Sequence, residues 1–318
     1  MSNFPTVGRI QRSDPALDDL IAPETEIELL EVGLAWSEGP VWVADGDYLL
    51  FSDIPRNAII QWSEAAGARI WMQPSGYTGV AYYGKEPGSN GLTFDANGHL
   101  HACEHGDRRV SRLDPKGGKR TVVDSYQGKR LNSPNDLVFH SNGNLYFTDP
   151  AYGLHYRYED PDRELDFCGV YLVRPGEHEP VLLTDELLNP NGLAFTPDEK
   201  YLYVTQSNPE RAILMKYPVN DDGTLGSGEV FKDVTEYVPK MAGAPDGMKV
   251  DRNGNVFTTG PGGVWVLSPG GDVLGRIETG ERIANLCWGD GGSTLYLCSH
   301  GLLCRVRTLT SGIIPGTT

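Results

Sequence analysis

The chain has 318 residues, including 39 glycines and 22 prolines, and it carries a formal net charge of −16. Turns fall at regular intervals between apolar runs, which is typical of all-β proteins, and the acidic surface argues against nucleic acid and anionic membranes as partners. The first 21 residues lack the apolar core of a signal peptide and no apolar run could span a bilayer, so we expect a cytoplasmic protein.

The predicted elements begin with an N-terminal extension over residues 1–24 that packs on the main domain. It contains one short helix at 15–21, and a strand follows within residues 25–36. From residue 37 onward the chain repeats one hairpin six times: an apolar strand, a turn of Asn, Asp and Gly, and a second apolar strand. The anchors of the first strands recur every 38 to 56 residues, at Trp42, Phe94, Phe139, Phe195, Val250 and Trp288.

Each hairpin continues into further strands. Third strands are expected within residues 57–64, 108–118, 168–177, 211–220, 262–271 and 301–308, and fourth strands within 68–73, 119–125, 179–185, 228–234 and 272–279. Six repeats of four antiparallel strands predict an all-β six-bladed β-propeller, with residues 25–318 as a single domain. Because the last repeat has only three strands, we expect the N-terminal strand at 25–36 to complete the sixth blade and to remove its open edge.

A polar residue precedes the first strand at the same position in five of the six repeats. Four residues before each anchor stand Glu38, Asn90, Asn135, Asn191, Asp246 and, in the last repeat, Ala284. We call the five polar residues the channel ring, because the first strands of propeller blades line the central channel and begin at one mouth. Asn285 lies one place later in its repeat and is not counted. The turns have their own Asn and Gly, so hairpin formation does not explain the ring.

The oxygen chemistry of the channel ring predicts a cation site. Converging carboxylate and amide oxygens are the ligands that Ca²⁺, Mg²⁺ and Mn²⁺ prefer, whereas Zn²⁺ usually takes His and Cys. No ring position holds His, and none of the five cysteines forms C-x-x-C. We therefore expect one divalent cation, with Ca²⁺ favoured and Mg²⁺, Mn²⁺ or Zn²⁺ as alternatives. Strand caps without an ion, or a purely structural ion, are the competing interpretation.

The sequence resembles the gluconolactonase family, which includes regucalcin (senescence marker protein) and is related in fold to the squid-type diisopropyl fluorophosphatase. The resemblance rests on SEGPVW, GKRLNSPNDLVF, FTDPAYGL, NPNGLAF and APDGMKV, which occur in this order within residues 36–300. It implies a six-bladed propeller with one divalent cation in the channel, held by Glu38, Asn135, Asn191 and Asp246. Family members hydrolyse sugar lactones, and some accept other esters or phosphoryl compounds. A small sugar lactone is therefore the expected substrate.

Hydrolysis of a lactone needs an electrophile at the carbonyl oxygen and an activated water. The resemblance favours Asp246 as the general base and Glu38 mainly as a ligand that could share this catalytic role. Metal ligation would keep both carboxylates ionised at neutral pH. One departure concerns substrate binding: Ser133 stands where regucalcin-like members carry an arginine, and Lys129 and Arg130 lie further upstream.

Further substrate contacts are expected around the same mouth, because second strands return to this end of the channel. Asp149 is predicted to orient Asn135 or a bound water, and His105 and His300 are predicted to contact hydroxyls or to move protons. The longest irregular insertion, 152–167, is expected to form a wall or lid. The predicted substrate-binding residues are Asn90, His105, Asn135, Asp149, Tyr152 and His300.

Two other functions stay open. One is a metal-dependent esterase or phosphotriesterase on the same scaffold, and the other is a non-enzymatic calcium-binding propeller. The sequence contains no G-x-S-x-G elbow, no G-x-G-x-x-G after a strand and no Walker loop, so neither a serine triad nor a nucleotide cofactor is expected. The oligomeric state is not predicted.

Overall fold

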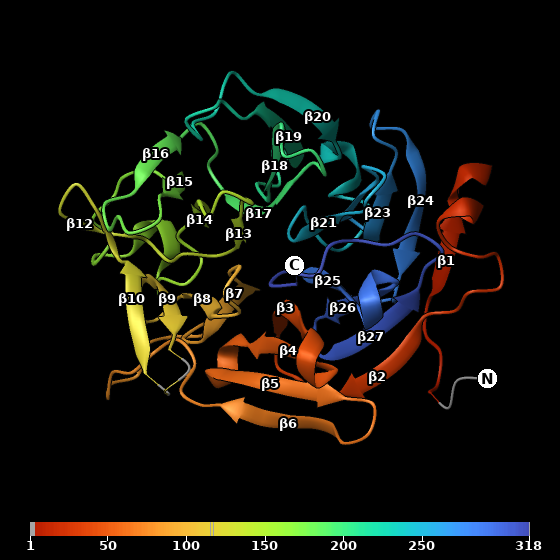
Figure 1. Cartoon of the computed structure of the whole chain (residues 1–318), viewed down its shortest axis with the longest axis horizontal. Coiled ribbons are helices and arrows are strands. Elements are labelled where there is room, and N and C mark those ends of the chain that lie inside the picture. The colour runs from red at the N-terminus through yellow and green to blue at the C-terminus, as the bar shows by residue number, and fades with distance from the viewer. Residues whose placement is uncertain (1–3, 115, 117, 318) are drawn as a thin grey trace.

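Six antiparallel sheets surround a central axis in the computed structural model, which describes residues 4–114, 116 and 118–317 (Figure 1). Blade one contains β3 (Ser37–Val43), β4 (Tyr48–Asp53), β5 (Ala58–Ser63) and β6 (Gly67–Met72). Blade two contains β7 (Ser89–Phe94), β8 (Leu100–Glu104), β9 (Arg109–Leu113) and β10 (Lys119–Val123). Blade three contains β13 (Leu137–Phe139), β14 (Leu145–Asp149), β15 (Gly169–Val173) and β16 (Val181–Thr184).

The second half of the ring repeats this arrangement. Blade four contains β17 (Pro190–Phe195), β18 (Tyr201–Gln206), β19 (Ile213–Pro218) and β20 (Glu229–Asp233). Blade five contains β21 (Met248–Val250), β22 (Val256–Gly260), β23 (Gly263–Leu267) and β24 (Val273–Glu278). Blade six contains β25 (Asn285–Gly289), β26 (Thr294–Ser299), β27 (Leu302–Arg307) and, from the N-terminal part of the chain, β2 (Glu28–Val32). The predicted six-bladed propeller is confirmed, and so is its closure by the N-terminal strand.

Two strand pairings lie outside the pattern that the sequence predicts. β1 (Arg9–Arg12) pairs with β24 as a fifth strand of blade five, and β11 (Ser125–Tyr126) pairs with β12 (Lys129–Arg130) in a small hairpin. β1 covers an outer edge that would otherwise be open.

The helices are short. The helix expected at 15–21 is the 3₁₀ helix η1 (Pro15–Asp19). The other 3₁₀ helices are η2 (Ala44–Gly46), η3 (Ile54–Arg56), η4 (Arg157–Glu159), η5 (Thr235–Tyr237) and η6 (Asp290–Gly292). Within the described residues, no helix has the length and apolarity needed to cross a membrane.

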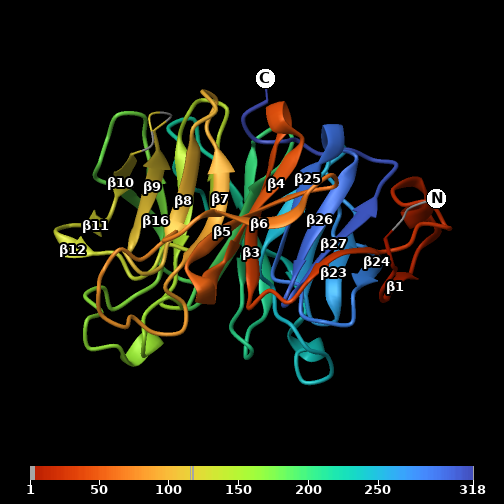
Figure 2. The ribbon, with the colours of Figure 1, turned by 90° about the horizontal axis from the view of Figure 1, so that it is seen from below.

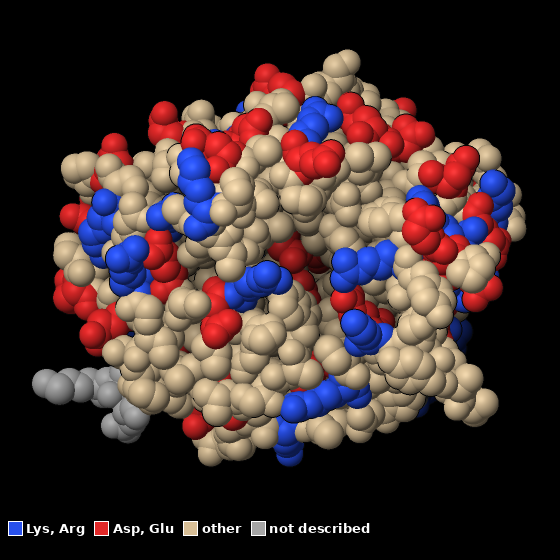
Figure 3. Space-filling view, turned by 180° about the vertical axis from the view of Figure 1, so that it is seen from behind, with Lys and Arg blue, Asp and Glu red and all other residues tan. Residues whose placement is uncertain are grey.

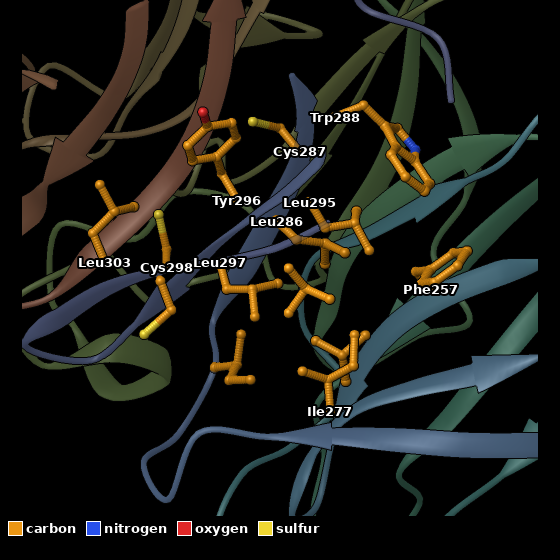
Figure 4. Packing of buried hydrophobic residues seen from close by; sticks show 14 of the residues in the cluster. Phe257, Ile277, Leu286, Cys287, Trp288, Leu295, Tyr296, Leu297, Cys298 and Leu303 are labelled. Atoms are coloured by element: carbon orange, nitrogen blue, oxygen red, sulfur yellow. The ribbon is translucent and has the colours of Figure 1, made fainter. Parts of the chain in front are cut away.

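The largest apolar cluster lies where blade six meets blades one and five. Trp42 of β3 stacks on Tyr296 of β26 with ring centroids 5.1 Å apart. Phe257 of β22 meets Trp288 of β25 edge-on, with ring centroids 5.2 Å apart, and Figure 4 shows these two rings. All four rings are buried. Because each sheet can bury its faces only against neighbouring blades, these contacts between blades help to hold the ring closed.

A buried ion pair joins the two ends of the chain within blade six. The Arg305 guanidinium on β27 contacts the Glu28 carboxylate on β2, and it also lies 2.7 Å from the carboxylate of Glu64. The Arg305 side chain is 2% exposed, whereas that of Glu64 is 63% exposed. Glu28 is buried whereas Glu64 is exposed to solvent, so the Glu28 charge is screened less and its contact stabilises the closed ring more than the Glu64 contact.

We predict that Glu28→Ala lowers the free energy of unfolding by about 3 kcal/mol, because a buried guanidinium loses its buried partner. Urea denaturation measures this loss. The matched control is Glu64→Ala, which removes the exposed partner and is expected to lower stability by less than about 1 kcal/mol. Equal losses in the two variants would contradict the assignment of Glu28 as the closing contact.

The first strands lie side by side around the axis, and the two ends of the channel differ (Figures 1 and 2). The C-terminal segment lies over one end, where Gly312 packs closely against the indole of Trp288. A cavity of about 1070 Å³ opens there, lined by apolar anchors that include Phe94 and Phe139. None of the five residues of the channel ring lines this cavity. The candidate chemistry therefore belongs to the opposite mouth.

Candidate functional site

The residues of the channel ring lie at the starts of the first strands, at the mouth opposite the C-terminal segment. Figure 3 shows that this face is hollowed at its centre, with acidic atoms at the floor and Lys and Arg on the rim. Glu38, Asn90, Asn135 and Asn191 are each between 3% and 4% exposed. Asp246 is partly exposed as a residue, but its Oδ1 is closed to solvent.

A local backbone irregularity lies beside the ring residue in three of the blades. The strand register shifts between Glu38 and Val41 in blade one, and at the equivalent places in blades two and four. Such bulges redirect a side chain that regular pleating would point elsewhere. The residue after Glu38 is Gly39, with a φ of +49° and an ideal Cβ position only 1.9 Å from the Asn90 carbonyl oxygen. Any side chain there would separate blades one and two at the ring.

The two carboxylates of the channel ring repel each other in a poorly solvated space. Burial, with a contribution from the nearby Asp136 charge, raises the pKa of Glu38 to about 8, although the Gly39 N–H donates to its Oε2 at 2.8 Å. Burial and the charge of Glu38 raise the pKa of Asp246 well above its usual range. Among the described residues, no Lys, Arg or His nitrogen lies within 4.0 Å of either carboxylate. A cation would remove this repulsion and let both groups ionise.

Unpartnered oxygens indicate where a cation would fit. Among the described residues, four buried side-chain oxygens lack a hydrogen-bond partner, and three of them belong to the channel ring: Asn90 Oδ1, Asn191 Oδ1 and Asp246 Oδ1. An unsatisfied buried acceptor destabilises a protein by about 1–3 kcal/mol, so three in one ring call for a ligand. No three His, Cys, Asp or Glu side chains of the described chain gather at a site. A cation here would therefore need amide oxygens, as the ring offers.

The orientation of Asn191 is fixed from outside the ring. Its Nδ2 donates to Ser207 Oγ at 2.9 Å, and that hydroxyl donates to the Pro245 carbonyl at 2.6 Å. Reversing the amide would place its oxygen against a hydroxyl whose proton is already committed. The Asn191 carbonyl oxygen therefore faces the channel, as a metal ligand must.

The last residues of several second strands hold the loops that carry the ring. Asp149 accepts the backbone N–H groups of Asn132 and Ser133, both at 2.8 Å, with its two carboxylate oxygens. Asp53 and Gln206 accept equivalent backbone N–H groups in blades one and four. Burial raises the pKa of Asp149 to about 7. These contacts hold the backbone two and three residues before Asn135, and the contact of Asp149 with substrate stays a prediction.

The remaining predicted residues lie at different depths. Burial raises the pKa of the Tyr152 hydroxyl to about 12, hydrogen bonding with Ser207 lowers this pKa, and the charge of Asp246 raises it. His105 is fully buried, and burial lowers its pKa to about 4, so its imidazole is neutral at pH 7. His300 lies at the rim: its side chain is 50% exposed and its ring is 5.2 Å from that of Trp36. The charge of Asp246 thus acts on the Tyr152 hydroxyl, whereas the neighbour of the His300 ring is Trp36.

Two polar residues inside the channel escape the sequence reasoning. Asp136 and Asn285 are buried, and Asn285 Nδ2 lies 3.5 Å from Asp136 Oδ2 across the channel. Both stand three residues before their anchors, where the other four repeats have glycine. Comparing that position across the repeats would have found them. Asn285, set aside in the sequence, therefore reaches the channel from the sixth blade.

Residues 36–301 match the model of the family described as the SMP-30/Gluconolactonase/LRE-like region. The chain belongs to this family. A gluconolactonase of Zymomonas mobilis subsp. mobilis is 39% identical over 317 residues, which cover 98% of this chain and 89% of that protein.

Solved structures agree with the fold. A gluconolactonase from Xanthomonas campestris superposes with a TM-score of 0.83 at 28% identity, covering 96% of this chain and 98% of that one. A calcium-binding protein, regucalcin, from Agrobacterium tumefaciens superposes with a TM-score of 0.70, covering 90% and 95% of the two chains. At 18% identity, the second likeness shows the fold alone.

The raised pKa of Glu38 predicts how the stability of cation-free protein depends on pH. Between its ordinary value of 4.5 and about 8, the folded state keeps a proton that the unfolded chain releases. Stability therefore falls as the pH rises from 5 to 8. Thermal unfolding in chelator-containing buffer should show Tm decreasing over this window, with a shallower decrease in Glu38→Gln. An identical slope in the variant would show that Glu38 does not carry this effect.

Proposed function

We propose that the protein is a divalent-cation-dependent hydrolase that opens a sugar lactone to the corresponding aldonic acid. The observation that carries this proposal is the channel ring, which places two mutually repelling carboxylates beside unpartnered amide oxygens. A gluconolactonase is 39% identical in sequence to this chain, and the matched region covers 98% of the chain. This similarity supports a sugar lactone as the substrate class. Ca²⁺ is the favoured ion, because every predicted ligand is an oxygen and the donors are mixed carboxylates and amides.

Glu38, Asn135, Asn191 and Asp246 are the residues that would hold the ion. When bound there, it would polarise the lactone carbonyl and stabilise negative charge on that oxygen. The protein's own part is to keep the ligands in place. Glu38 is anchored by the Gly39 N–H, and Asn191 is anchored by Ser207.

Asp246 is the proposed general base. Its backbone is fixed from both sides, because its N–H donates to Thr259 Oγ1 at 2.9 Å and its carbonyl accepts from Thr205 Oγ1 at 2.7 Å. Its carboxylate would take a proton from the water that attacks the lactone carbonyl and would then pass the proton to the departing ring oxygen. Tyr152 lies beside it and supplies a hydroxyl, protonated at neutral pH, to bind the sugar.

The experiment that tests this function is hydrolysis of D-glucono-1,5-lactone by chelator-treated protein, with Ca²⁺, Mn²⁺, Mg²⁺ or Zn²⁺ added back singly. We expect one or more of these ions to restore activity. Asp246→Asn keeps a ligand oxygen but removes the base, so it should retain ion binding and lower kcat by about 10²- to 10⁴-fold. Asp246→Ala should lose both.

The controls separate the alternatives. Ion binding with turnover of aryl esters or phosphotriesters, but of no lactone, would replace the substrate class and keep the site. Full activity in the presence of chelator would contradict cation dependence. Normal kcat in Asp246→Asn would move the general base to another residue, with Glu38 the next to test.

A further inference from the structure

Asn90 has the same arrangement as Asn191, although the resemblance does not include it among the cation ligands. Its Nδ2 lies 3.3 Å from His105 Nε2, and its Oδ1 is buried without a hydrogen-bond partner. In Asn191 the Nδ2 is likewise held from outside, by Ser207, and the Oδ1 is likewise buried and unpartnered. Both side chains start from the same position of their blades. The two amides therefore present equivalent oxygens to the channel.

His105 decides which way the Asn90 amide points. When Nε2 carries no proton it can only accept a hydrogen bond, so the amide nitrogen must face it and the carbonyl oxygen must face the channel. The proton then resides on the buried Nδ1, which makes no hydrogen bond and lies 3.6 Å from Glu86 Oε2. The Glu86 carboxylate lies on the Nδ1 side of the ring, so its negative charge, without a hydrogen bond, favours the tautomer that the Asn90 orientation requires.

The imidazole has no room to leave this position. His105 is 0% exposed, and its backbone carbonyl accepts from the Tyr83 hydroxyl at 3.0 Å. Gly153 packs on the ring so closely that an ideal Cβ on Gly153 would stand 2.5 Å from His105 Cγ. Gly153 therefore packs against the imidazole and prevents it from moving toward loop 152–167. The contact also joins the loop 152–167 to the blade-two side of the site.

The Asn90 oxygen is closed to solvent, and this closure limits what it can bind. A sugar hydroxyl must enter from the open mouth and needs room for a group at least as large as water. A cation held by the neighbouring ring oxygens needs only a close approach, at about 2.3–2.6 Å for Ca²⁺. A buried, unpartnered oxygen on a ring that also contains Asn191 Oδ1 and Asp246 Oδ1 fits the cation better.

We propose that Asn90 is a fifth oxygen directed at the cation, and that His105, supported by Glu86, is the positioning residue that fixes it. This inference rests on the proposed function, because it assumes that the channel ring binds a cation. It departs from the expectation that Asn90 and His105 contact the substrate. In this proposal Asn90 and His105 of blade two contribute to the affinity for the cation. Tyr152 then remains as the candidate residue for binding the sugar.

The test is calorimetric titration of the full, chelator-stripped chain with Ca²⁺, which reads ion affinity without turnover. His105→Leu removes the acceptor and should weaken Ca²⁺ binding by about 10- to 100-fold. His105→Gln places an amide oxygen near the position of Nε2 and should restore affinity to within about threefold. His105→Asn, whose amide reaches only the position of Nδ1, is the matched control and should behave like the leucine variant.

A double-mutant comparison separates positioning from general damage. In an Asn90→Ala background, His105→Leu should cause no further loss of Ca²⁺ affinity, since both changes remove one interaction. Additive losses would overturn the proposal. Thermal unfolding reports whether each variant is folded. Glu86→Ala changes a partly exposed side chain and removes the support of His105, so this variant should also weaken Ca²⁺ binding.

Two results would overturn the inference in different ways. Wild-type Ca²⁺ affinity in folded His105→Leu and Glu86→Ala, together with a raised KM for the lactone, would assign the pair to substrate binding and leave the proposed function intact. Absence of Ca²⁺, Mn²⁺, Mg²⁺ and Zn²⁺ binding by the wild-type chain would overturn this inference and the cation-dependent function together.

Discussion

The position of the channel ring depends on one hydrogen bond that recurs between neighbouring blades. A hydroxyl near the end of a second strand donates to the backbone carbonyl of the ring residue in the next blade. The three examples are Ser52 to Asn90 at 2.8 Å, Thr148 to Asn191 at 2.7 Å and Thr205 to Asp246 at 2.7 Å. In these three places a blade thus sets the height of its neighbour's ring residue, so the positions of Asn90, Asn191 and Asp246 depend on contacts between blades.

Because the ring residues come from different blades, the candidate site forms only when the propeller is closed. Glu38 and Asp246 come from blades one and five, yet the charge of one raises the pKa of the other. No single blade would bring them this near. The pairing of β2 with β27 and the buried Arg305–Glu28 contact keep the propeller closed although the two carboxylates repel each other. A bound cation would attract both carboxylates and so remove this repulsion.

Much of the site could be predicted from the sequence because propeller repeats share a register. The five ring residues stand at one position relative to their anchors, and the repeat alone indicated that they converge. Asp136 and Asn285 were not predicted as channel residues, because their shared position is glycine in the other four repeats and so shows no polar pattern along the sequence. β1 escaped because four half-buried or exposed polar and apolar residues give no clear strand pattern.

Side-chain direction is the part that register does not determine. The sequence predicts that Asp149 contacts substrate, and the structure shows its two oxygens accepting from the backbone N–H groups of Asn132 and Ser133. The sequence predicts that His105 contacts a hydroxyl, and the structure shows it buried with its Nε2 beside the Asn90 amide. In both cases, the position along the strand was informative. The hydrogen-bond partner depended on loops that the repeat does not specify.

The central claim is that the channel ring holds one divalent cation. The most direct measurement is the anomalous scattering of Mn²⁺ in crystals of the chelator-treated protein soaked with the ion. The account predicts a single strong peak at the mouth opposite the C-terminal segment, within about 2.0–2.6 Å of Asp246 Oδ1 and Asn191 Oδ1. A map without a peak there, or with its strongest peak at another place, would contradict the account.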